Sequence, residues 1–282
     1  MRQHSAGQST KQRKAARVSS FLLCGPLPVK DLCGIILDYS QHFEGKPALV
    51  WNTHTSRVTA LAVLPDGKLA SGSWDKTVRV WENGACLLTL AGHTESVTAL
   101  AVLPDGKLAS GSYDNTVRVW EDSACLLTLA GHTDAVEALA VLSDGKLASG
   151  SWDKTVRVWD ASSGACLLTL VGHTGPVFVL AVLPDCKLAS GSHDKTVRMW
   201  NAASGACLLT LAVHTGPVRA LAVLPDGRLA SGSWDETVRM WDPTSGECML
   251  TLSHTSEVTC MALLRDGKLV MGLADGTIHV WE

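Results

Sequence analysis

Aromatic side chains, surplus charge and long apolar runs are all scarce in this 282-residue chain. It has ten Trp, three Phe and two Tyr, and its formal net charge is −3. A chain without a basic surplus is poorly suited to neutralise phosphates, which argues against a general nucleic-acid binder. No apolar run approaches the roughly 20 residues that span a bilayer, so no membrane-spanning helix is predicted. The nine cysteines are an odd number, which excludes complete pairing in internal disulfides.

Repetition is what the sequence has in abundance. The dipeptide His-Thr begins at residues 54, 93, 132, 173, 214 and 254, at intervals of 39, 39, 41, 41 and 40 residues. Each His-Thr precedes a near-copy of VTALAVLPDGKLASGSWDKTVRVW, and a short polar loop and CLLTLAG lead to the next one. Six such units cover residues 54–282. Repeats of this length indicate units that stack on one another, because none can bury a core alone.

Each unit predicts four short strands and no helix. VTALAV, KLASGS, TVRVW and CLLTL are the strands, and PDGK and WDKT supply tight turns between them. The second strand consists of small residues, which suits a place where neighbouring backbones approach closely.

The unit His-Thr…Ser-Gly-Ser-x-Asp-x-Thr-Val-x-x-Trp resembles the WD-repeat (WD40) family of β-propellers. The resemblance implies blades of four antiparallel strands around a central axis. We therefore expect an all-β fold, a six-bladed WD40 β-propeller over residues 47–282. Residues 1–46 contain neither the Ser-x-Asp nor the Trp of a further unit, although seven blades are the commonest number in the family.

The two ends of the repeat region complement each other. The sixth unit stops at Trp281-Glu282, after its third strand, whereas PALVWN (47–52) aligns with the CLLTLAG that precedes later His-Thr pairs. We predict that 47–52 pairs in the last blade and closes the ring, which hides two strand edges.

The His, Ser and Asp of each unit are also the residue types of a hydrolase triad. Five complete sets in one domain do not fit an enzyme, so no catalytic residue is predicted. In the WD-repeat family these residues and the third-strand Trp form a hydrogen-bonded chain that locks each blade. The resemblance implies that role for His54, Ser71, Asp75, Trp81, His93, Ser110, Asp114, Trp120, His132, Ser149, Asp153, Trp159, His173, Ser190, Asp194, Trp200, His214, Ser231, Asp235, Trp241, His254, Asp275 and Trp281. In the sixth unit Met271 replaces the Ser, and we expect that blade to be the least rigid.

Cysteine recurs at the start of the fourth strand, at Cys86, Cys125, Cys166, Cys207 and Cys248. Five equivalent positions in five units are too dispersed for a metal cluster, and we interpret them as small buried hydrophobic residues in a reducing compartment. No metal site and no cofactor is predicted. Cys186 stands where other units have the Gly of PDGK. If that position needs positive φ, the substitution costs about 1 kcal/mol.

One variable position precedes the turn Asp. In the family it lies on the top face of the propeller and often contacts ligands. Here it is Trp74, Tyr113, Trp152, His193, Trp234 and Ala274. Partly exposed Trp and Tyr dominate binding hot spots, which favours partner binding, although the rings could instead pack on the neighbouring blade.

A second variable region follows His-Thr. Its candidate partner-binding residues are Arg57, Glu95, Asp134, Glu137, Phe178, Arg219 and Glu257. The acidic groups of units two and three beside aromatic rings predict a peptide that carries Lys or Arg. The arginine of TVRVW recurs at regular spacing around the ring, and we call these residues the Arg belt: Arg79, Arg118, Arg157, Arg198 and Arg239. We interpret the belt as solvated or snorkelling side chains and not as a nucleic-acid site.

The first 46 residues divide in two. Residues 1–30 contain no acid and predict a disordered basic tail, with a nuclear or transit-like signal in KQRKAAR as the alternative. Residues 31–46 predict a short helix packed under the propeller, since Leu32, Ile35, Ile36 and Tyr39 recur with helical spacing. LPVKDLCGIILDYS also resembles the opening of an F-box, which would make the protein a substrate-recruiting subunit of a ubiquitin ligase.

The function that we predict is a non-catalytic scaffold that binds a protein or peptide partner on the top face. We expect a monomeric propeller within a larger complex, in the cytoplasm, with the nucleus as the alternative location.

Overall fold

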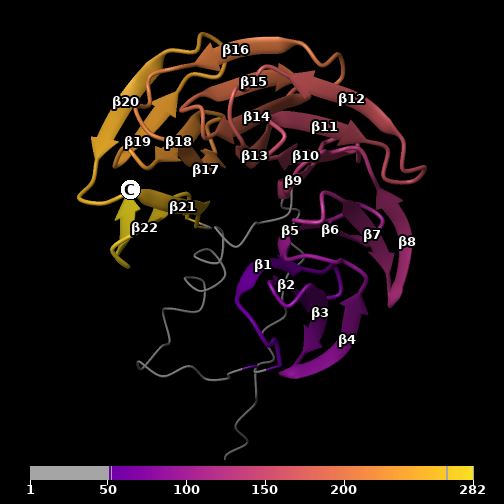
Figure 1. Ribbon diagram of the computed structural model, residues 1–282. Helices are drawn as coiled ribbons and strands as arrows, with labels where there is room; N and C mark the ends of the chain where they lie inside the picture. The colour runs from indigo at the N-terminus through magenta and orange to yellow at the C-terminus, as the bar shows by residue number, and fades with distance from the viewer. Residues whose placement is uncertain (1–50, 52, 265, 282) are drawn as a thin grey trace, which may run out of the picture.

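The computed structural model describes residues 51, 53–264 and 266–281, and this part of the chain consists of strands, turns and loops without a helix. No helix that could cross a membrane therefore occurs in it. The strands form six antiparallel sheets, each built from consecutive strands, and we number these blades 1 to 6. The blades follow one another around an arc, with the first strand of each on the inner side and the fourth on the outer side (Figure 1).

The strand bounds repeat from blade to blade. Blade 1 consists of β1 (Val58–Val63), β2 (Leu69–Ser73), β3 (Thr77–Glu82) and β4 (Ala85–Ala91). Blade 2 consists of β5 (Val97–Val102), β6 (Leu108–Ser112), β7 (Val117–Glu121) and β8 (Ala124–Leu129). Blade 3 consists of β9 (Val136–Val141), β10 (Leu147–Ser151), β11 (Thr155–Trp159) and β12 (Cys166–Val171).

The remaining blades follow the same order. Blade 4 consists of β13 (Val177–Leu183), β14 (Lys187–Ser192), β15 (Val197–Asn201) and β16 (Cys207–Leu211). Blade 5 consists of β17 (Val218–Val223), β18 (Leu229–Ser233), β19 (Thr237–Trp241) and β20 (Cys248–Ser253). Blade 6 has three strands within the described residues, β21 (Val258–Leu263), β22 (Leu269–Leu273) and β23 (Ile278–Trp281).

The hydrophobic core is divided among the blade interfaces. Each of five buried clusters joins residues of two neighbouring blades, and the first strands of neighbours pack side by side. The close approach depends on a glycine in the second strand: a Cβ at Gly72 would lie 2.7 Å from Val97 Cγ1 of the next blade. The Ser-Gly-Ser strand is therefore small for the reason predicted, since any side chain there would push the blades apart.

A β-bulge interrupts the pairing of the first two strands in every blade. The register shift leaves one residue of each first strand unpaired: Thr59, Thr98, Glu137, Phe178, Arg219 and Thr259. Bulges re-aim side chains at functional places in sheets. The positions are those at which the sequence varies most along the first strand.

The arc of described residues is open between blades 6 and 1. The first valine of β5, β9, β13, β17 and β21 is fully buried, whereas the equivalent Val58 of β1 is 37% exposed. Within the described residues, β21 does not pack on β1 in the way that other first strands pack on their neighbours. A hollow of about 270 Å³ on this side of blade 1 is lined by Trp51, Val58, Leu61, Leu69 and Trp81, among others.

Trp51 occupies the place that the sequence alignment gives it. Its ring lies 5.7 Å from the ring of Trp81, and its Nε1 would be 3.3 Å from a Cβ at Gly84. In blades 3 to 5 a leucine of the preceding fourth strand lies nearest to a Cβ placed on the equivalent glycine, as Leu129 does at Gly164. Trp51 therefore stands in for a fourth-strand leucine against blade 1.

The all-β fold and the six blades are confirmed. The rest of the predicted closing strand, the basic tail and the segment 31–46 lie outside the described residues, so ring closure by 47–52, the helix and the F-box-like interpretation stay predictions.

Cys186 has the strained backbone that the sequence implied. Its φ is 56°, and Asp185 beside it has a φ of 59°. The glycines at the equivalent turn position have φ between 84° and 87°, for example Gly145 and Gly227. A side chain with a Cβ is disfavoured in this left-handed region, and glycine is not.

We predict that Cys186→Gly raises the free energy of unfolding by about 1 kcal/mol, because it removes the Cβ from a left-handed turn. The measurement is urea denaturation of both proteins. Cys166→Gly is the control: Cys166 lies in β12, where glycine weakens the strand, so stability should fall. Equal loss in both variants would show that the turn at Cys186 is unstrained.

Candidate functional site

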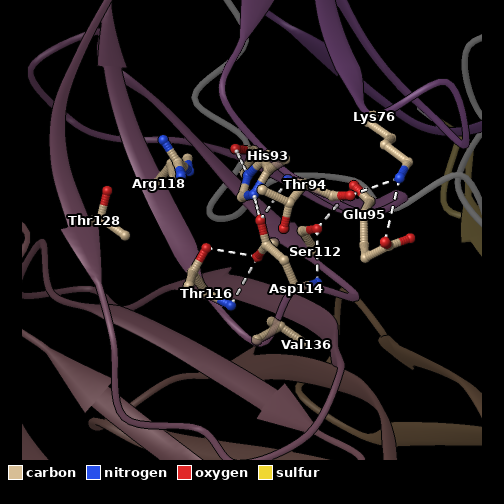
Figure 2. A network of polar contacts seen from close by, with 12 residues as sticks. Lys76, His93, Thr94, Glu95, Ser112, Asp114, Thr116, Arg118, Thr128 and Val136 are labelled. Atoms are coloured by element: carbon tan, nitrogen blue, oxygen red, sulfur yellow. Dashed lines mark hydrogen bonds and ion pairs between the residues drawn. The ribbon is translucent and has the colours of Figure 1, made fainter.

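In blades 1 to 5 the predicted His, Ser, Asp and Trp form one hydrogen-bonded chain, which we call the relay. The Trp Nε1–H donates to the Ser Oγ at 2.7–2.8 Å, and the same Oγ lies 2.7 Å from the His Nε2. The His Nδ1 is 2.7–2.8 Å from an Asp Oδ2. Figure 2 shows the blade 2 site, where Asp114 lies between His93 and Thr116.

The Trp and the Asp at the two ends of the relay determine which atom donates in each of its hydrogen bonds. Trp can only donate and an ionised Asp can only accept, so His Nδ1–H donates to Asp and Ser Oγ–H donates to His Nε2. Burial alone would raise the pKa of Asp75, but hydrogen bonds from Thr77, His54 and Thr55 outweigh it and lower the pKa to about 2. The pKa of Asp114 is lowered by hydrogen bonds from His93 and Thr116, again against the opposing effect of burial. The Asp end is therefore a stable anion.

Blade 6 lacks the relay. Met271 is fully buried at the Ser position, and no hydrogen bond joins His254 to Asp275 within the described residues. The Nδ1 of His254 instead lies 3.2 Å from the Nδ1 of His279, and its Nε2 is buried without a hydrogen-bond partner there. Burial, together with the nearby His279, lowers the pKa of His254.

A backbone hydrogen bond fixes the relative position of two loops in every blade, including blade 6, which lacks the relay. The backbone N–H of the residue before the turn Asp donates to a carbonyl in the loop after His-Thr, as Trp74 does to Arg57 at 2.9 Å and Trp152 to Ala135 at 2.8 Å. The same bond recurs in the other four blades. Both variable regions therefore lie at one end of the propeller, which we call the top face.

The rings of the top face touch one another in a row. Tyr113 and Trp152 have centroids 5.7 Å apart, Trp152 and Phe178 6.4 Å, and Phe178 and His193 5.9 Å, all edge to face. Trp152 and Trp234 are each 39% exposed. We call Tyr113, Trp152, His193 and Trp234 the aromatic arc. Phe178 is only 5% exposed, so it supports the arc from beneath and does not lie on its surface.

Two guanidinium groups complete this surface. Arg219 lies over the Phe178 ring, 4.0 Å from its centroid, and 5.5 Å from the centroid of Trp234. Arg57 lies 5.5 Å from the centroid of Trp74 on blade 1. Trp234 is thereby connected to the ring row through Arg219, because the guanidinium contacts rings on both sides. Ala274 provides no ring on blade 6.

Glu137 interacts with Arg219 and Tyr113, and these contacts were not predicted from the sequence. Its Oε1 is 3.8 Å from Arg219 Nη2, an ion pair that reaches from blade 3 to blade 5. Burial of Tyr113, together with the charge of Glu137 and a hydrogen bond to it, raises the pKa of Tyr113 to about 12. The bulges in β9 and β17 explain the pairing, since each releases its residue from the strand ladder. The only signal of this pair in the sequence is that Glu137 and Arg219 occupy the same repeat position, where three other units have Thr.

The predicted acidic sector is largely neutralised. Glu95 forms an ion pair with Lys76 at 3.2 Å (Figure 2), and Glu137 is paired with Arg219. Asp134 is exposed and accepts the backbone N–H of Ala135, and Glu257 is exposed. The sector therefore offers less free negative charge than the sequence predicts.

The prediction that the fourth-strand cysteines are buried is wrong. Cys125, Cys166 and Cys207 are exposed, and Cys86 and Cys248 are half-buried, because the fourth strand is the outermost of each blade. In blades 2 to 5 the sulfur atom lies beside the arginine of the third strand, for example Cys166 Sγ at 3.5 Å from Arg157 Nη1. The arginines are half-buried, and their Nε atoms lack a hydrogen-bond partner within the described residues. The Arg157 Cζ also lies 6.0 Å from the ring centroid of Trp159 in the same strand, as a snorkelling side chain would place it.

Antiparallel blades that follow one another around an arc, five of them locked by a buried Trp–Ser–His–Asp relay, define a β-propeller of WD-repeat type. The family model "WD domain, G-beta repeat" matches residues 45–82, 84–121, 123–160, 164–201, 205–242 and 246–282. The chain belongs to this family.

Two comparisons add detail. The crystal structure of the WD40 beta propeller domain of Doa1 superposes with a TM-score of 0.69, at 26% sequence identity, over 79% of this chain and 79% of that one. The ribosome biogenesis protein BOP1 homolog of Monosiga brevicollis is 48% identical over 50 residues. That match spans 17% of this chain and 6% of the relative.

We predict that Ser110→Ala lowers the free energy of unfolding by about 1–3 kcal/mol, because Trp120 Nε1 and His93 Nε2 both lose their buried partner. Urea denaturation measures the change. Ser123→Ala, at an exposed position of the same blade, is the control and should change stability by less than about 0.5 kcal/mol. Similar values for the two variants would contradict a stabilising relay.

A second prediction concerns the Glu137 cluster. Glu137→Gln removes the negative charge beside Tyr113, so the pKa of Tyr113 should fall from about 12 toward its ordinary value. Absorbance of tyrosinate during an alkaline titration measures it, with Tyr39 as the only other tyrosine. Glu95→Gln, whose acid pairs with Lys76, should leave the titration unchanged. An unaltered titration in Glu137→Gln would exclude the contact.

Proposed function

We propose that the protein is a non-catalytic scaffold that binds a partner protein or peptide on the top face of the propeller. The observation that carries this proposal is the aromatic arc. Tyr113, Trp152 and His193 are held by edge-to-face contacts with each other or with Phe178, and Arg219 connects Trp234 to them. Rigid, partly exposed Trp and Tyr give up little conformational entropy on binding, which makes them effective anchors.

The charges around the arc refine the kind of partner. Because Glu95 and Glu137 are already paired, they contribute little attraction for a Lys or Arg of the partner. The arc itself presents ring faces and edges over a width of four blades. We therefore favour a partner segment that contributes apolar or aromatic side chains to the arc, with Asp134 and Glu257 at its rim.

A non-catalytic role is supported by the burial and the hydrogen bonding of the five relay serine hydroxyl groups. Ser71 is 3% exposed, and the equivalent serines of blades 2 to 5 are fully buried. Each Oγ already accepts from a Trp Nε1–H and is bonded to its His. A substrate cannot reach a nucleophile in this state, so the sets are structural. The ubiquitin-ligase alternative depends on a segment outside the described residues, and no contact within them favours it.

The test is capture of partners from a lysate of the source cell by immobilised full-length protein. We expect the double variant Trp152→Ala/Trp234→Ala to lose specific partners that the unaltered protein retains, because it removes two exposed rings of the arc. The matched control is Leu126→Ala/Leu208→Ala, which truncates two side chains that are each 44% exposed on the outer strands.

Two outcomes would contradict the proposal. One is recovery of the same partners in the same amounts by the arc variant. The other is an equal loss in the control variant, which would place binding on the outer rim. Circular dichroism and denaturation of both variants show whether they are folded, because all four side chains lie at the surface.

A further inference from the structure

The blade 6 site differs from the other five in two ways that act together. Met271 replaces the relay serine, and His279 occupies the position at which blades 1 to 5 carry the belt arginine. Where the other blades have a His facing a carboxylate, blade 6 has two imidazoles whose Nδ1 atoms are 3.2 Å apart. The ring centroids are 5.3 Å apart. Two bases therefore converge on one point at the edge of the described arc.

The distance between these nitrogen atoms matches a single bound metal ion. Two imidazole nitrogens about 2.0–2.1 Å from a tetrahedral Zn²⁺ lie about 3.3 Å from each other. We propose that His254 and His279 together bind one divalent cation of the class that prefers imidazole, with Zn²⁺ as the reference ion. The described residues contain no group of three or more candidate ligands, so water would occupy the other positions.

Asp275 supplies a negative charge at this place. It keeps the turn of its repeat, with Thr277 N and Oγ1 both donating to its Oδ1. Hydrogen bonds from Thr277, with a smaller effect of His279, lower the pKa of Asp275 and keep it ionised. In the other blades the second carboxylate oxygen accepts from the relay His, a bond that Asp275 does not form within the described residues. Its charge favours a cation beside the two histidines.

Binding needs only a change of tautomer. When both rings are neutral, one Nδ1–H donates to the other Nδ1. To offer two lone pairs, the donating ring moves that proton to its Nε2, and no net proton is released. The five relay histidines cannot do the same, because Ser and Asp engage both of their nitrogens. The site is therefore specific to blade 6.

A bound cation would replace the relay that blade 6 lacks. In blades 1 to 5 the relay ties the first loop to the third strand through the serine and the Trp. In blade 6 a cation between His254 and His279 would tie the same loop to β23, the edge strand of the described arc. The metal would thus stabilise the blade that lacks the relay.

The experiment uses the full chain with exposed thiols alkylated by iodoacetamide, so that cysteine does not compete for the metal. Histidine rings labelled with ¹³C are followed by NMR while Co²⁺ and then Zn²⁺ are added. We expect the signals of His254 and His279 to respond first. His193, an exposed histidine of the aromatic arc, is the internal reference for non-specific binding.

Variants make the assignment decisive. His279→Arg restores the residue of the other five blades and should reduce Zn²⁺ affinity at least tenfold, together with the increase in Tm that Zn²⁺ produces. The matched control, His193→Trp, likewise installs a residue that other blades carry and should retain both effects. An equal response of His193 and His254 to the metal, or unchanged affinity in His279→Arg, would overturn the proposal.

Discussion

Five of the six blades depend on one buried hydroxyl group, that of the relay serine. The serine oxygen receives the Trp indole N–H and is bonded to the His ring, and the His in turn holds the turn aspartate. Remove the hydroxyl and two buried polar groups lose their partners at once, which costs more than the hydrogen bonds contribute individually. The relay thereby ties the inner loop, the second strand, the third strand and the turn into one unit. Blade 6, in which Met271 replaces the serine, shows how the same backbone forms without it.

The relay also explains why the top face is a suitable binding surface. Its aspartate anchors the turn that carries the variable aromatic residue, and the turn's backbone is bonded to the loop after His-Thr. The shared scaffold is therefore rigid, while the residue before the aspartate is free to vary. Because this position recurs at one end of every blade, substitutions in neighbouring blades place rings side by side, with Phe178 between Trp152 and His193 and Arg219 between Phe178 and Trp234. The residues that differ between nearly identical repeats are thus gathered on the top face in a fixed arrangement.

Much of this was predictable from the repeat itself. The strands, the turns, the relay residues and the small second strand follow from local pattern, and Gly72 against Val97 gives the physical reason for the last. The exposure of Cys125 was not predictable, because the residue pattern of a strand does not show whether that strand is the outermost of its blade. Nor was the ion pair between Glu137 and Arg219, which belong to blades 3 and 5 and are 82 residues apart in the sequence numbering. Its formation depends on where two bulges aim their side chains.

The sequence by itself determined the number of repeats, their strands and the identity of the locking residues, because these rest on short-range periodicity and on the chemistry of single side chains. Only the tertiary structure decided which groups from different blades meet. It placed Phe178 beneath the arc, paired Glu95 and Glu137 with cations and brought His254 to His279. The physical reason is that such contacts depend on how far one blade is rotated and shifted against the next. Packing of valine on glycine sets that relation, and no pattern within a single repeat records it.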